Sequence, residues 1–455
     1  MSKPKEYSFM TKDKLMTYTF VALLIITVVS AALWAQVTPK DPVTQAPLMN
    51  LGLTVGIVAL IAVGVAVAVD ALLYKIVSDS PLNTMSAAVF GLIVADSYSL
   101  GVPGMAVGTG DALPAALLSA PQCFIYVAII SLIGLIVFKK VQGLTGRKLV
   151  NPAAAAKFIV LLPFIGSIFL AAAHYAPYDM STGGLSVPHL ASPIGSTFTT
   201  YLQSCYANPA ATTYPDLNQL MILQKFHGWI GGASSLAVII VGIALFALAR
   251  RYIKWRITVA YFVGIVLMSM LMWGVYGGDA YVRLMFEIFI GSSIFLGFFM
   301  ATDPASTPLT YNGQIIFGIG LAVLTVLIQT YMNFFGGSIL ALLVMNLFSP
   351  SLDKIGKGKP MTESKEPKLP KSQLFTPEKV KLYECIRCGA CMKVCCHRLS
   401  PILIKQAYDK QNFDALVKLN ADYCTGCGHC TFVCPARIDL RKTVLMAKGA
   451  LRGQQ

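Results

Sequence analysis

The chain has 455 residues, of which 56% are hydrophobic and only 13% are charged, whereas a soluble globular protein carries about a quarter charged residues. Long apolar runs account for this balance better than one large core, so an ordinary soluble domain is excluded. Of the formal net charge of +15, +10 lies in residues 351–455, which hold 19 Lys and Arg and 9 Asp and Glu. This distribution is typical of a basic cytoplasmic tail beside a membrane. Since no nucleic-acid motif accompanies it, we expect no nucleic-acid partner.

Ten apolar segments follow a short N-terminal stretch, residues 1–16, that has no small-residue cleavage site and is therefore expected to be a cytoplasmic lead. A helix needs about 20 apolar residues to cross a bilayer core, and three of the ten segments are shorter or interrupted by glycine. We predict an all-α polytopic membrane protein with about ten transmembrane helices, over residues 17–36, 51–75, 84–100, 119–138, 153–173, 229–249, 257–276, 281–301, 314–332 and 335–350.

Basic residues indicate how these spans are oriented, because loops rich in Lys and Arg stay on the cytoplasmic side. With ten spans, four groups of Lys and Arg fall on one side of the membrane. The loop 174–224 on the other side contains neither Lys nor Arg. Both termini are therefore predicted to be cytoplasmic and the loop 174–228 to face outward. The groups are Lys3, Lys5, Lys12 and Lys14; Lys139, Lys140, Arg147 and Lys148; Arg250, Arg251, Lys254 and Arg256; and Lys354, Lys357 and Lys359.

The two halves of the membrane part share a short pattern. "FGLIVADSYS" at 90–99 and "LGFFMATDPAS" at 296–306 each end an apolar run with glycine, three large apolar residues, alanine and a nearby aspartate. Five spans in each half would make the halves inverted repeats, an arrangement that often places a site near the bilayer midplane. Chance similarity is the alternative.

Four acids lie inside or at the end of apolar runs, where charge is costly and often functional. They are the candidate ion path: Asp70, Asp96, Glu287 and Asp303. The plainer interpretation is that Asp96 and Asp303 cap broken helices, and that Glu287 pairs with Arg283 one helical turn away.

The last quarter of the chain differs in composition. Residues 351–374 are polar and rich in Lys and Pro, as in a linker, and they precede a compact domain over 375–455. Nine of the eleven cysteines fall between Cys385 and Cys434. Such clustering favours metal ligation in a reducing compartment over a disulfide framework. The domains expected are thus the N-terminal segment 1–16, the membrane domain 17–350, the linker and this cytoplasmic domain.

Two C-x2-C-x2-C-x3-C runs predict two [4Fe–4S] clusters, in which three cysteines of one run are joined by the fourth of the other. The predicted ligand sets are Cys385, Cys388, Cys391 and Cys434 for the first cluster, and Cys424, Cys427, Cys430 and Cys395 for the second. Zinc is the competing metal. Cys396 replaces the usual proline after the fourth cysteine and is either a buried free thiol or a substitute for Cys395.

The sequence resembles two components of known redox complexes. "CIRCGACMKVC" and "KLNADYCTGCGHCTFVCPARIDL", within 382–450, are similar to the two-cluster ferredoxin module of the Rnf complex C subunit. "GRKLVNPAAAAKFIVLL" at 146–162 and the segment 300–354 resemble the Rnf D subunit and the Nqr B subunit, as does most of 15–354. This second resemblance implies a ten-helix flavoprotein in an electron-transfer chain that is coupled to movement of Na+ or H+.

The same resemblance implies a covalent FMN on a threonine in an outward loop. The nearest match to the S-G-A-T-like motif is "PIGSTF", with Thr197 as the candidate FMN-binding residue and Ile194 where the motif has serine. Riboflavin is a further cofactor candidate. The alternatives are non-covalent flavin, or an ordinary Thr-rich loop without flavin.

Together these features predict a membrane subunit of an Rnf- or Nqr-like complex in the cytoplasmic (inner) membrane. It would relay electrons between a cytoplasmic ferredoxin or reductase and a flavin in the membrane or on its outer side, with other subunits as partners. We expect no catalytic residue and no NADH oxidation by this chain alone, since it has neither a G-x-G-x-x-G after a strand nor a Walker motif. The alternatives are a transporter or channel with a redox-sensing tail, and a membrane anchor for a soluble reductase.

Overall fold

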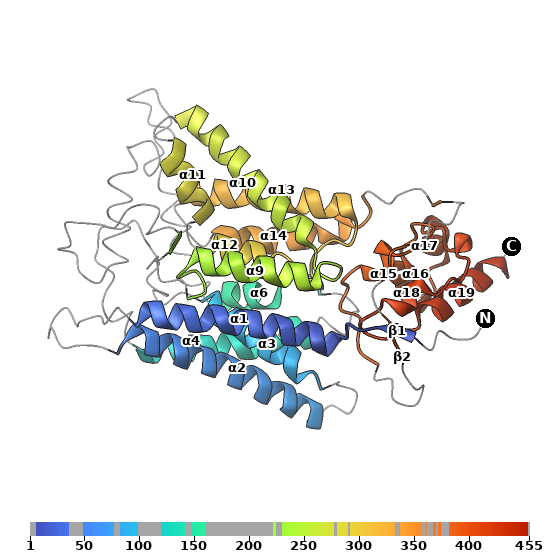
Figure 1. The fold of residues 1–455 in the computed structure, drawn as a ribbon, viewed down its shortest axis with the longest axis horizontal. Helices are drawn as coiled ribbons and strands as arrows, with labels where there is room; N and C mark the ends of the chain where they lie inside the picture. The colour runs from blue at the N-terminus through green and yellow to red at the C-terminus, as the bar shows by residue number, and fades with distance from the viewer. Residues whose placement is uncertain are drawn as a thin grey trace.

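The computed structural model describes residues 6–35, 49–76, 82–98, 120–141, 148–160, 222–223, 230–276, 280–289, 292–332, 337–355, 360–361, 367–369, 372–374 and 382–453. Within these ranges the chain forms a bundle of long apolar helices and a small helical domain that lies at one end of the bundle (Figure 1). Both the first helix and the last long helix of the bundle have an end next to the small domain.

The first half of the bundle is built on close contacts between helix backbones. Gly91 allows such an approach, because a Cβ there would lie only 2.7 Å from the Ala62 carbonyl oxygen. Helix α2 packs against α1, α3 and α4. The elements are α1 (Lys12–Trp34), α2 (Leu51–Ile76), α3 (Thr84–Asp96), α4 (Ala120–Ile133) with its π-helical continuation η2 (Gly134–Val141), and α6 (Pro152–Val160).

The second half packs chiefly through α10 against α13 and α13 against α14. Its elements are α9 (Ser235–Ala249), α10 (Trp255–Tyr276), α11 (Ala280–Phe289), α12 (Ser293–Phe295) with the π-helical η4 (Leu296–Met300), α13 (Tyr311–Met332) and α14 (Gly337–Leu352). Large apolar side chains stand outward on both halves, with Leu60 74%, Leu248 67% and Leu267 65% exposed. Such surfaces suit lipid and would be a liability in water.

Five helices of the described residues are long and apolar enough to cross a membrane: α1, α2, the helix Cys123–Val141, α10 and α13. Residues Arg283–Phe289 and Ser293–Met300 meet at 58° and together would make a sixth span. Three apolar helices, α3, α9 and α14, are shorter. The expected helical, multi-pass membrane protein is therefore confirmed, whereas the full number of ten spans and the inverted repeats stay predictions.

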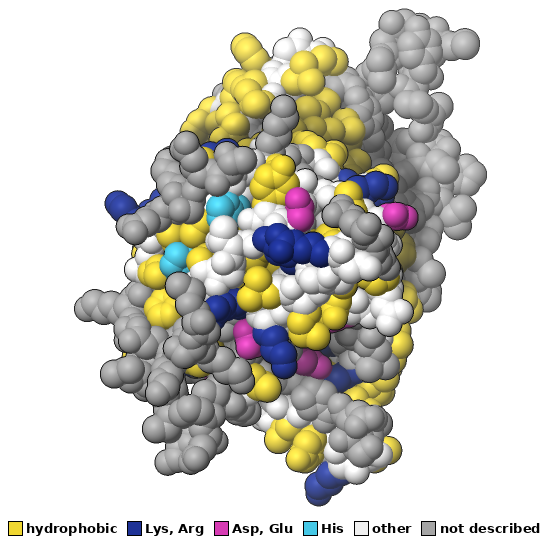
Figure 2. All heavy atoms as spheres, turned by 90° about the vertical axis from the view of Figure 1, so that its right-hand side faces the viewer, with side chains coloured by type: hydrophobic (Ala, Val, Ile, Leu, Met, Phe, Trp, Pro, Cys, Tyr) yellow, Lys and Arg dark blue, Asp and Glu magenta, His cyan; other side chains and the backbone are white. Residues whose placement is uncertain are grey.

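The C-terminal domain has its own small core. Helix α16 (Pro401–Asp409) packs against α19 (Leu440–Arg452), and buried Ile404, Leu416 and Val444 belong to this core. The other elements are α15 (Ala390–Lys393), α17 (Phe413–Lys418), the 3-10 helix η6 (Ala421–Tyr423) and α18 (His429–Phe432). Figure 2 looks onto this end of the molecule, where Lys and Arg side chains gather near the middle of the face.

A two-stranded antiparallel sheet joins the segment that precedes the membrane domain in sequence to the linker that follows it. Strand β1 (Glu6–Ser8) pairs with β2 (Ser372–Leu374), with Glu6 opposite Leu374 and Ser8 opposite Ser372. No pattern in the sequence indicates this pairing, because the strands are three residues long and lie in segments that are expected to be irregular.

Candidate functional site

Four cysteines surround a hollow in the part of the C-terminal domain nearest the membrane helices. They are Cys385, Cys388, Cys391 and Cys434, with Ile402, Ile438 and Leu440 as apolar walls. The hollow encloses about 340 Å³ and is partly open to solvent. These are the four residues that the spacing assigned to the first cluster, three from one run and one from the other.

A second hollow of about 380 Å³ lies beside it. Its cysteines are Cys395, Cys424, Cys427 and Cys430, and Leu399 and Val444 form part of its apolar wall. The structure thus brings together the members of each predicted ligand set and keeps the two sets apart.

The two cysteine runs form these hollows because they share one backbone course. At three equivalent positions both runs adopt a positive φ: Arg387 (53°) and Gly426 (71°), Gly389 (73°) and Gly428 (84°), Arg398 (58°) and Arg437 (59°). These residues turn the chain back on itself, so that the cysteine side chains point to a common centre. The turns also direct main-chain N–H groups at sulfur: Arg387 N lies 3.4 Å from Cys385 Sγ, and Gly426 N lies 3.4 Å from Cys424 Sγ.

The donor set of each hollow fits a [4Fe–4S] cluster, which takes four thiolates and is tuned by N–H···S contacts of this kind. In the protein alone, burial raises the pKa of Cys388 to about 12 and that of Cys434 to about 11. In the other hollow it raises the pKa of Cys430 to about 12. These thiols therefore hold their protons at neutral pH, and iron would have to displace them on binding.

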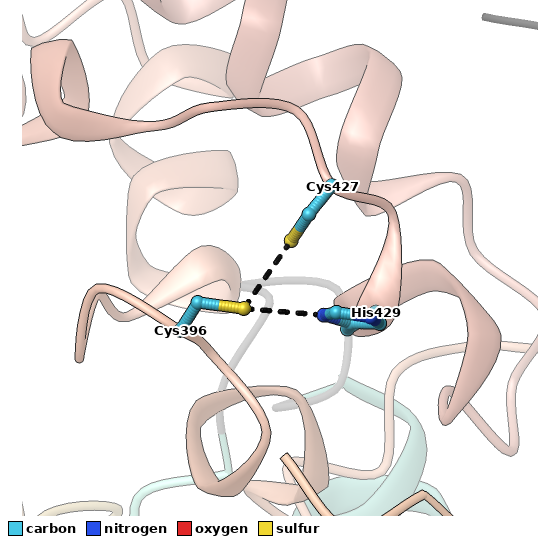
Figure 3. A group of neighbouring side chains, drawn as sticks. All are labelled: Cys396, Cys427 and His429. Carbon is cyan, nitrogen blue, oxygen red and sulfur yellow. Dashed lines mark hydrogen bonds between the residues drawn. The ribbon is translucent and has the colours of Figure 1, made fainter. Parts of the chain in front are cut away.

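Cys396 lies beside Cys427 but does not line the second hollow. Its side chain is buried, and its Sγ lies 3.2 Å from His429 Nδ1 and 3.8 Å from Cys427 Sγ (Figure 3). The neighbouring Cys395, by contrast, lines the hollow. This placement favours the interpretation of Cys396 as a buried free thiol. His397 is occupied elsewhere, with Nδ1 2.7 Å from the Met361 carbonyl oxygen and Nε2 3.2 Å from Thr425 Oγ1.

Three of the candidate ion-path acids, Asp70, Asp96 and Glu287, are buried within the helix bundle. Asp96 accepts a hydrogen bond from Thr27 Oγ1 (2.8 Å), and its main-chain carbonyl accepts one from Gly231 N (2.6 Å). Glu287 accepts one from Thr330 Oγ1 (3.3 Å). Asp96 is the last residue of α3, as the helix-end interpretation expects.

Asp70 and Asp303 are closer to the end that carries the cysteine domain. Asp70 forms an ion pair with Lys140 (2.7 Å) and accepts from Asn83 N (2.9 Å). Asp303 accepts from Ala305 N (3.3 Å) and Ser306 Oγ (2.9 Å), which shapes the turn after η4. The described residues show no hydrogen bond that joins any two of the four acids.

Lys157 and Lys254 are buried. Sequence reasoning did not single out Lys157, and it used Lys254 only to orient the spans. Lys157 in α6 donates to the Ser97 carbonyl oxygen. Lys254, just before α10, donates to the Pro304 and Thr307 carbonyl oxygens (2.8 and 2.9 Å) and to Thr307 Oγ1 (3.0 Å). Burial lowers the pKa of Lys254 to about 7, while these oxygens favour its charged form. The candidate flavin residue Thr197 lies outside the described residues.

Comparison with known proteins supports both parts of the chain. Residues 3–362 match the model of the NQR2, RnfD, RnfE family, and residues 384–438 match that of a 4Fe-4S dicluster domain. The expected resemblance of the membrane part to the Rnf D and Nqr B subunits is thereby confirmed, and the C-terminal part is confirmed as a two-cluster 4Fe-4S domain.

Individual relatives are similar over half to two thirds of this chain. The D subunit of the ion-translocating oxidoreductase complex of Pseudomonas paraeruginosa is 30% identical over 271 residues, which are 55% of this chain and 74% of the relative. The D subunit of the Na(+)-translocating ferredoxin:NAD(+) oxidoreductase complex of Acetobacterium woodii is 28% identical over 303 residues, 66% of this chain and 80% of the relative. A proton-translocating counterpart from Clostridium ljungdahlii is 28% identical over 238 residues, 50% and 66% of the two chains.

Proposed function

The chain belongs to the NQR2, RnfD, RnfE family and carries a 4Fe-4S dicluster domain, and we propose that it is the membrane subunit of an ion-translocating electron-transfer complex with its own iron–sulfur port. Its relatives are named as the D subunits of such complexes. Other membrane subunits and a soluble carrier, a ferredoxin or a reductase, are the partners this implies.

One observation carries the proposal: two hollows, each lined by four cysteines, lie at one end of a bundle of membrane helices. Bound there, [4Fe–4S] clusters would accept and release single electrons. The chain supplies the ligands Cys385, Cys388, Cys391 and Cys434 to one site and Cys424, Cys427, Cys430 and Cys395 to the other. It also supplies apolar walls and directed N–H groups, which set the potential of such sites.

We place the cysteine domain on the cytoplasmic side of the inner membrane. In support, basic residues of the bundle lie next to this domain. The main-chain N–H of Lys12 donates to the Pro435 carbonyl oxygen (3.0 Å), and Lys393 Nζ donates to the Arg251 carbonyl oxygen (2.7 Å). Lys140 pairs with Asp70 near the same end of the bundle. Positive residues mark the cytoplasmic side. The proposal includes ten spans in two inverted halves, and an ion path that uses Asp70, Asp96, Glu287 and Asp303.

A flavin on the opposite side completes the proposed chain of redox centres. Thr197 is the candidate attachment residue for FMN, on the strength of the motif "PIGSTF" and the family resemblance. The cofactor would carry the redox chemistry, while the protein supplies position and electrostatics.

The central test is the cofactor content of the purified protein. We expect iron and acid-labile sulfide at about eight atoms each per chain and an EPR signal on reduction with dithionite. Protein purified under anaerobic conditions that contains zinc and no sulfide would contradict the proposal. For the flavin, a fluorescent band in a denaturing gel should disappear in Thr197→Ala and persist in the control Thr199→Ala.

A further inference from the structure

The first cysteine hollow lies against the membrane domain, with Cys385 exposed at its open edge. Cys388 packs in one apolar cluster with Leu15 at the start of α1 and with Ala249 and Tyr252 at the end of α9. Cys391 and Cys434, on another side of the hollow, pack with Leu309 from the turn between η4 and α13. Three separate elements of the helix bundle therefore cover this site.

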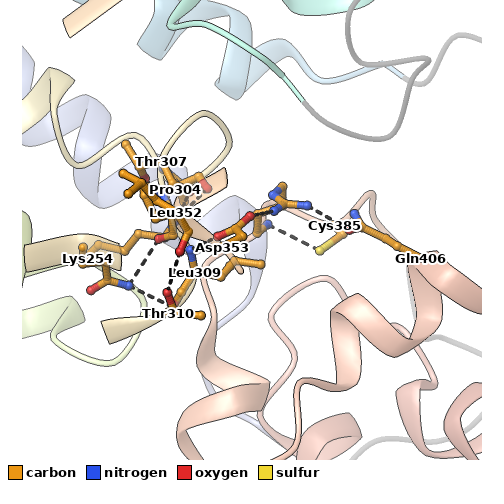
Figure 4. Close-up of polar contacts among 12 residues, drawn as sticks. Lys254, Pro304, Thr307, Leu309, Thr310, Leu352, Asp353, Cys385 and Gln406 are labelled. Carbon is orange, nitrogen blue, oxygen red and sulfur yellow. Dashed lines mark hydrogen bonds and ion pairs between the residues drawn. The ribbon is translucent and has the colours of Figure 1, made fainter. Parts of the chain in front are cut away.

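A buried ion pair fastens the same hollow to the bundle. Arg387 NH2 lies 3.1 Å from Asp353 Oδ2 at the end of α14, and the two side chains are only 3% and 8% exposed. Asp353 Oδ1 also accepts from Leu309 N (2.6 Å), and Arg387 NH1 donates to Gln406 Oε1 (3.0 Å). Figure 4 shows this line of contacts running from the membrane turn to Cys385.

The backbone at Arg387 supports a specific role for this side chain. Its φ of 53° is that of the left-handed region, which the second run gives to glycine at the equivalent position, Gly426. A long side chain at such a position costs free energy unless it makes a compensating contact. The contact that it makes here is with the membrane domain.

The second hollow has one exposed side, while Cys395 on another side borders a cavity that is also lined by Leu309 and Thr310 of the membrane domain. Cys427 and Thr425 at its rim are exposed, and Leu445, which lies against Gly426, is 38% exposed. Tyr423, at the end of η6, is also exposed. Apolar side chains beside a redox site are typical of the centre of a docking surface.

Basic residues surround this exposed rim. Arg441 lines the second hollow, and Lys448 Nζ donates to the Cys424 carbonyl (2.8 Å). Lys442 and Arg452 on α19 are exposed. Over residues 382–453 there are eleven Lys and Arg against five Asp and Glu, of which Asp422 is exposed and Asp439 caps α19.

We infer that the two cysteine sites have different roles. The Cys385 site is the inner contact, attached to the membrane domain by the Arg387–Asp353 ion pair. The Cys424 site is the outer contact, where a small soluble one-electron carrier protein with an acidic surface docks on the rim of Thr425, Cys427, Leu445 and the basic residues of α19. This inference rests on the proposed function. The exchange moves one electron: a reduced carrier is oxidised by one electron and the protein is reduced by one, with no bond made or broken.

The docking face is tested with an acidic plant-type ferredoxin as the probe, on the full-length protein in nanodiscs. The double variant Lys442→Glu/Arg452→Glu should slow electron transfer from the reduced probe by at least about tenfold at low ionic strength and abolish its salt dependence. The matched control Lys75→Glu reverses an exposed charge at the end of α2 and should leave the rate within about twofold. An equal loss in both variants, or no loss in either, would overturn the docking face.

The order of the two sites in electron transfer is tested with Cys427→Ser, which removes a ligand of the outer site. The probe should then reduce the inner site at least about tenfold more slowly than in the wild type, while dithionite still produces its EPR signal. Reduction of the inner site by the probe at the wild-type rate would overturn the inference. Absence of any EPR signal with dithionite in the wild type would instead refute the proposed function, so the two failures are distinguishable.

Discussion

The two cysteine runs have the same spacing and the same backbone course, yet they differ in what surrounds them. The first run has Arg387 where the second has Gly426, and both residues adopt a positive φ. The arginine reaches Asp353 of the membrane domain, whereas the glycine leaves room for the exposed Leu445. One local structure thus serves twice, and the Arg387–Asp353 pair is a contact with the membrane part that only the first copy can make.

The sharpest test of the comparison removes a cysteine from each run. Cys388→Ser should lower the iron content from about eight to about four atoms per chain, and Cys427→Ser should do the same. Only Cys388→Ser should also loosen the contact with α1 and α9, because Cys388 packs there. Iron assay with hydrogen exchange over 382–453 measures both effects. Cys123→Ala, remote in α4, serves as the control, and equal loosening in both serine variants would contradict the difference.

The ion pair gives the next largest effect. Arg387→Met alone leaves Asp353 buried without its cation and should destabilise the docked domain by about 3–5 kcal/mol, whereas Arg387→Met/Asp353→Leu should be close to neutral. Thermal unfolding in detergent, followed by hydrogen exchange of α15 to α19, gives the two values. If the double variant is as unstable as the single one, the pair is not what holds the domain in place.

A smaller effect is expected where the second run relies on glycine. Gly426→Ala places a Cβ on a residue with φ of 71° and 3.3 Å from Leu445, which should cost roughly 1–2 kcal/mol. Gly449→Ala, in α19 with open space around it, is the matched control and should stabilise the domain by roughly 0.5–1 kcal/mol. Thermal melts of the two variants should therefore shift in opposite directions, and shifts in the same direction would contradict this view of the loop.

The smallest effect should come from the residue that breaks the usual pattern. Cys396→Pro restores the common residue after the fourth cysteine and removes the contact with His429. Because Cys396 does not line the second hollow, both clusters should persist, with a change in stability below about 1 kcal/mol. Iron content and the EPR spectrum provide the check. Loss of half the iron would instead identify Cys396 as a ligand.

Regular spacing allowed much of the site to be predicted. The assignment of cysteines to two sets followed from C-x2-C-x2-C-x3-C, because in two-cluster ferredoxins with this spacing the fourth cysteine of each run binds the other cluster. The apolar segments likewise predicted helices, since α2 and α10 begin within two residues of the expected positions.

Contacts between distant segments could not be predicted in this way. Nothing near Asp353 in the sequence indicates that it meets Arg387, and the bend between α11 and α12 depends on packing, not on local composition. The difference between Arg387 in the first run and Gly426 at the equivalent position of the second is visible in the sequence and indicates that the two runs have different surroundings. A comparison of the runs residue by residue would have drawn attention to it.

The pairing of β1 with β2 has a consequence for biogenesis. Residues 6–8 leave the ribosome before the membrane helices, but their partner strand, 372–374, is made only after all of those helices. Since chains fold as they emerge, the N-terminal strand cannot pair until the helices of the bundle have been made. Pairing of β1 with β2 therefore occurs late in synthesis. An affinity tag fused ahead of residue 6 would interfere with this last step of assembly and not with membrane insertion.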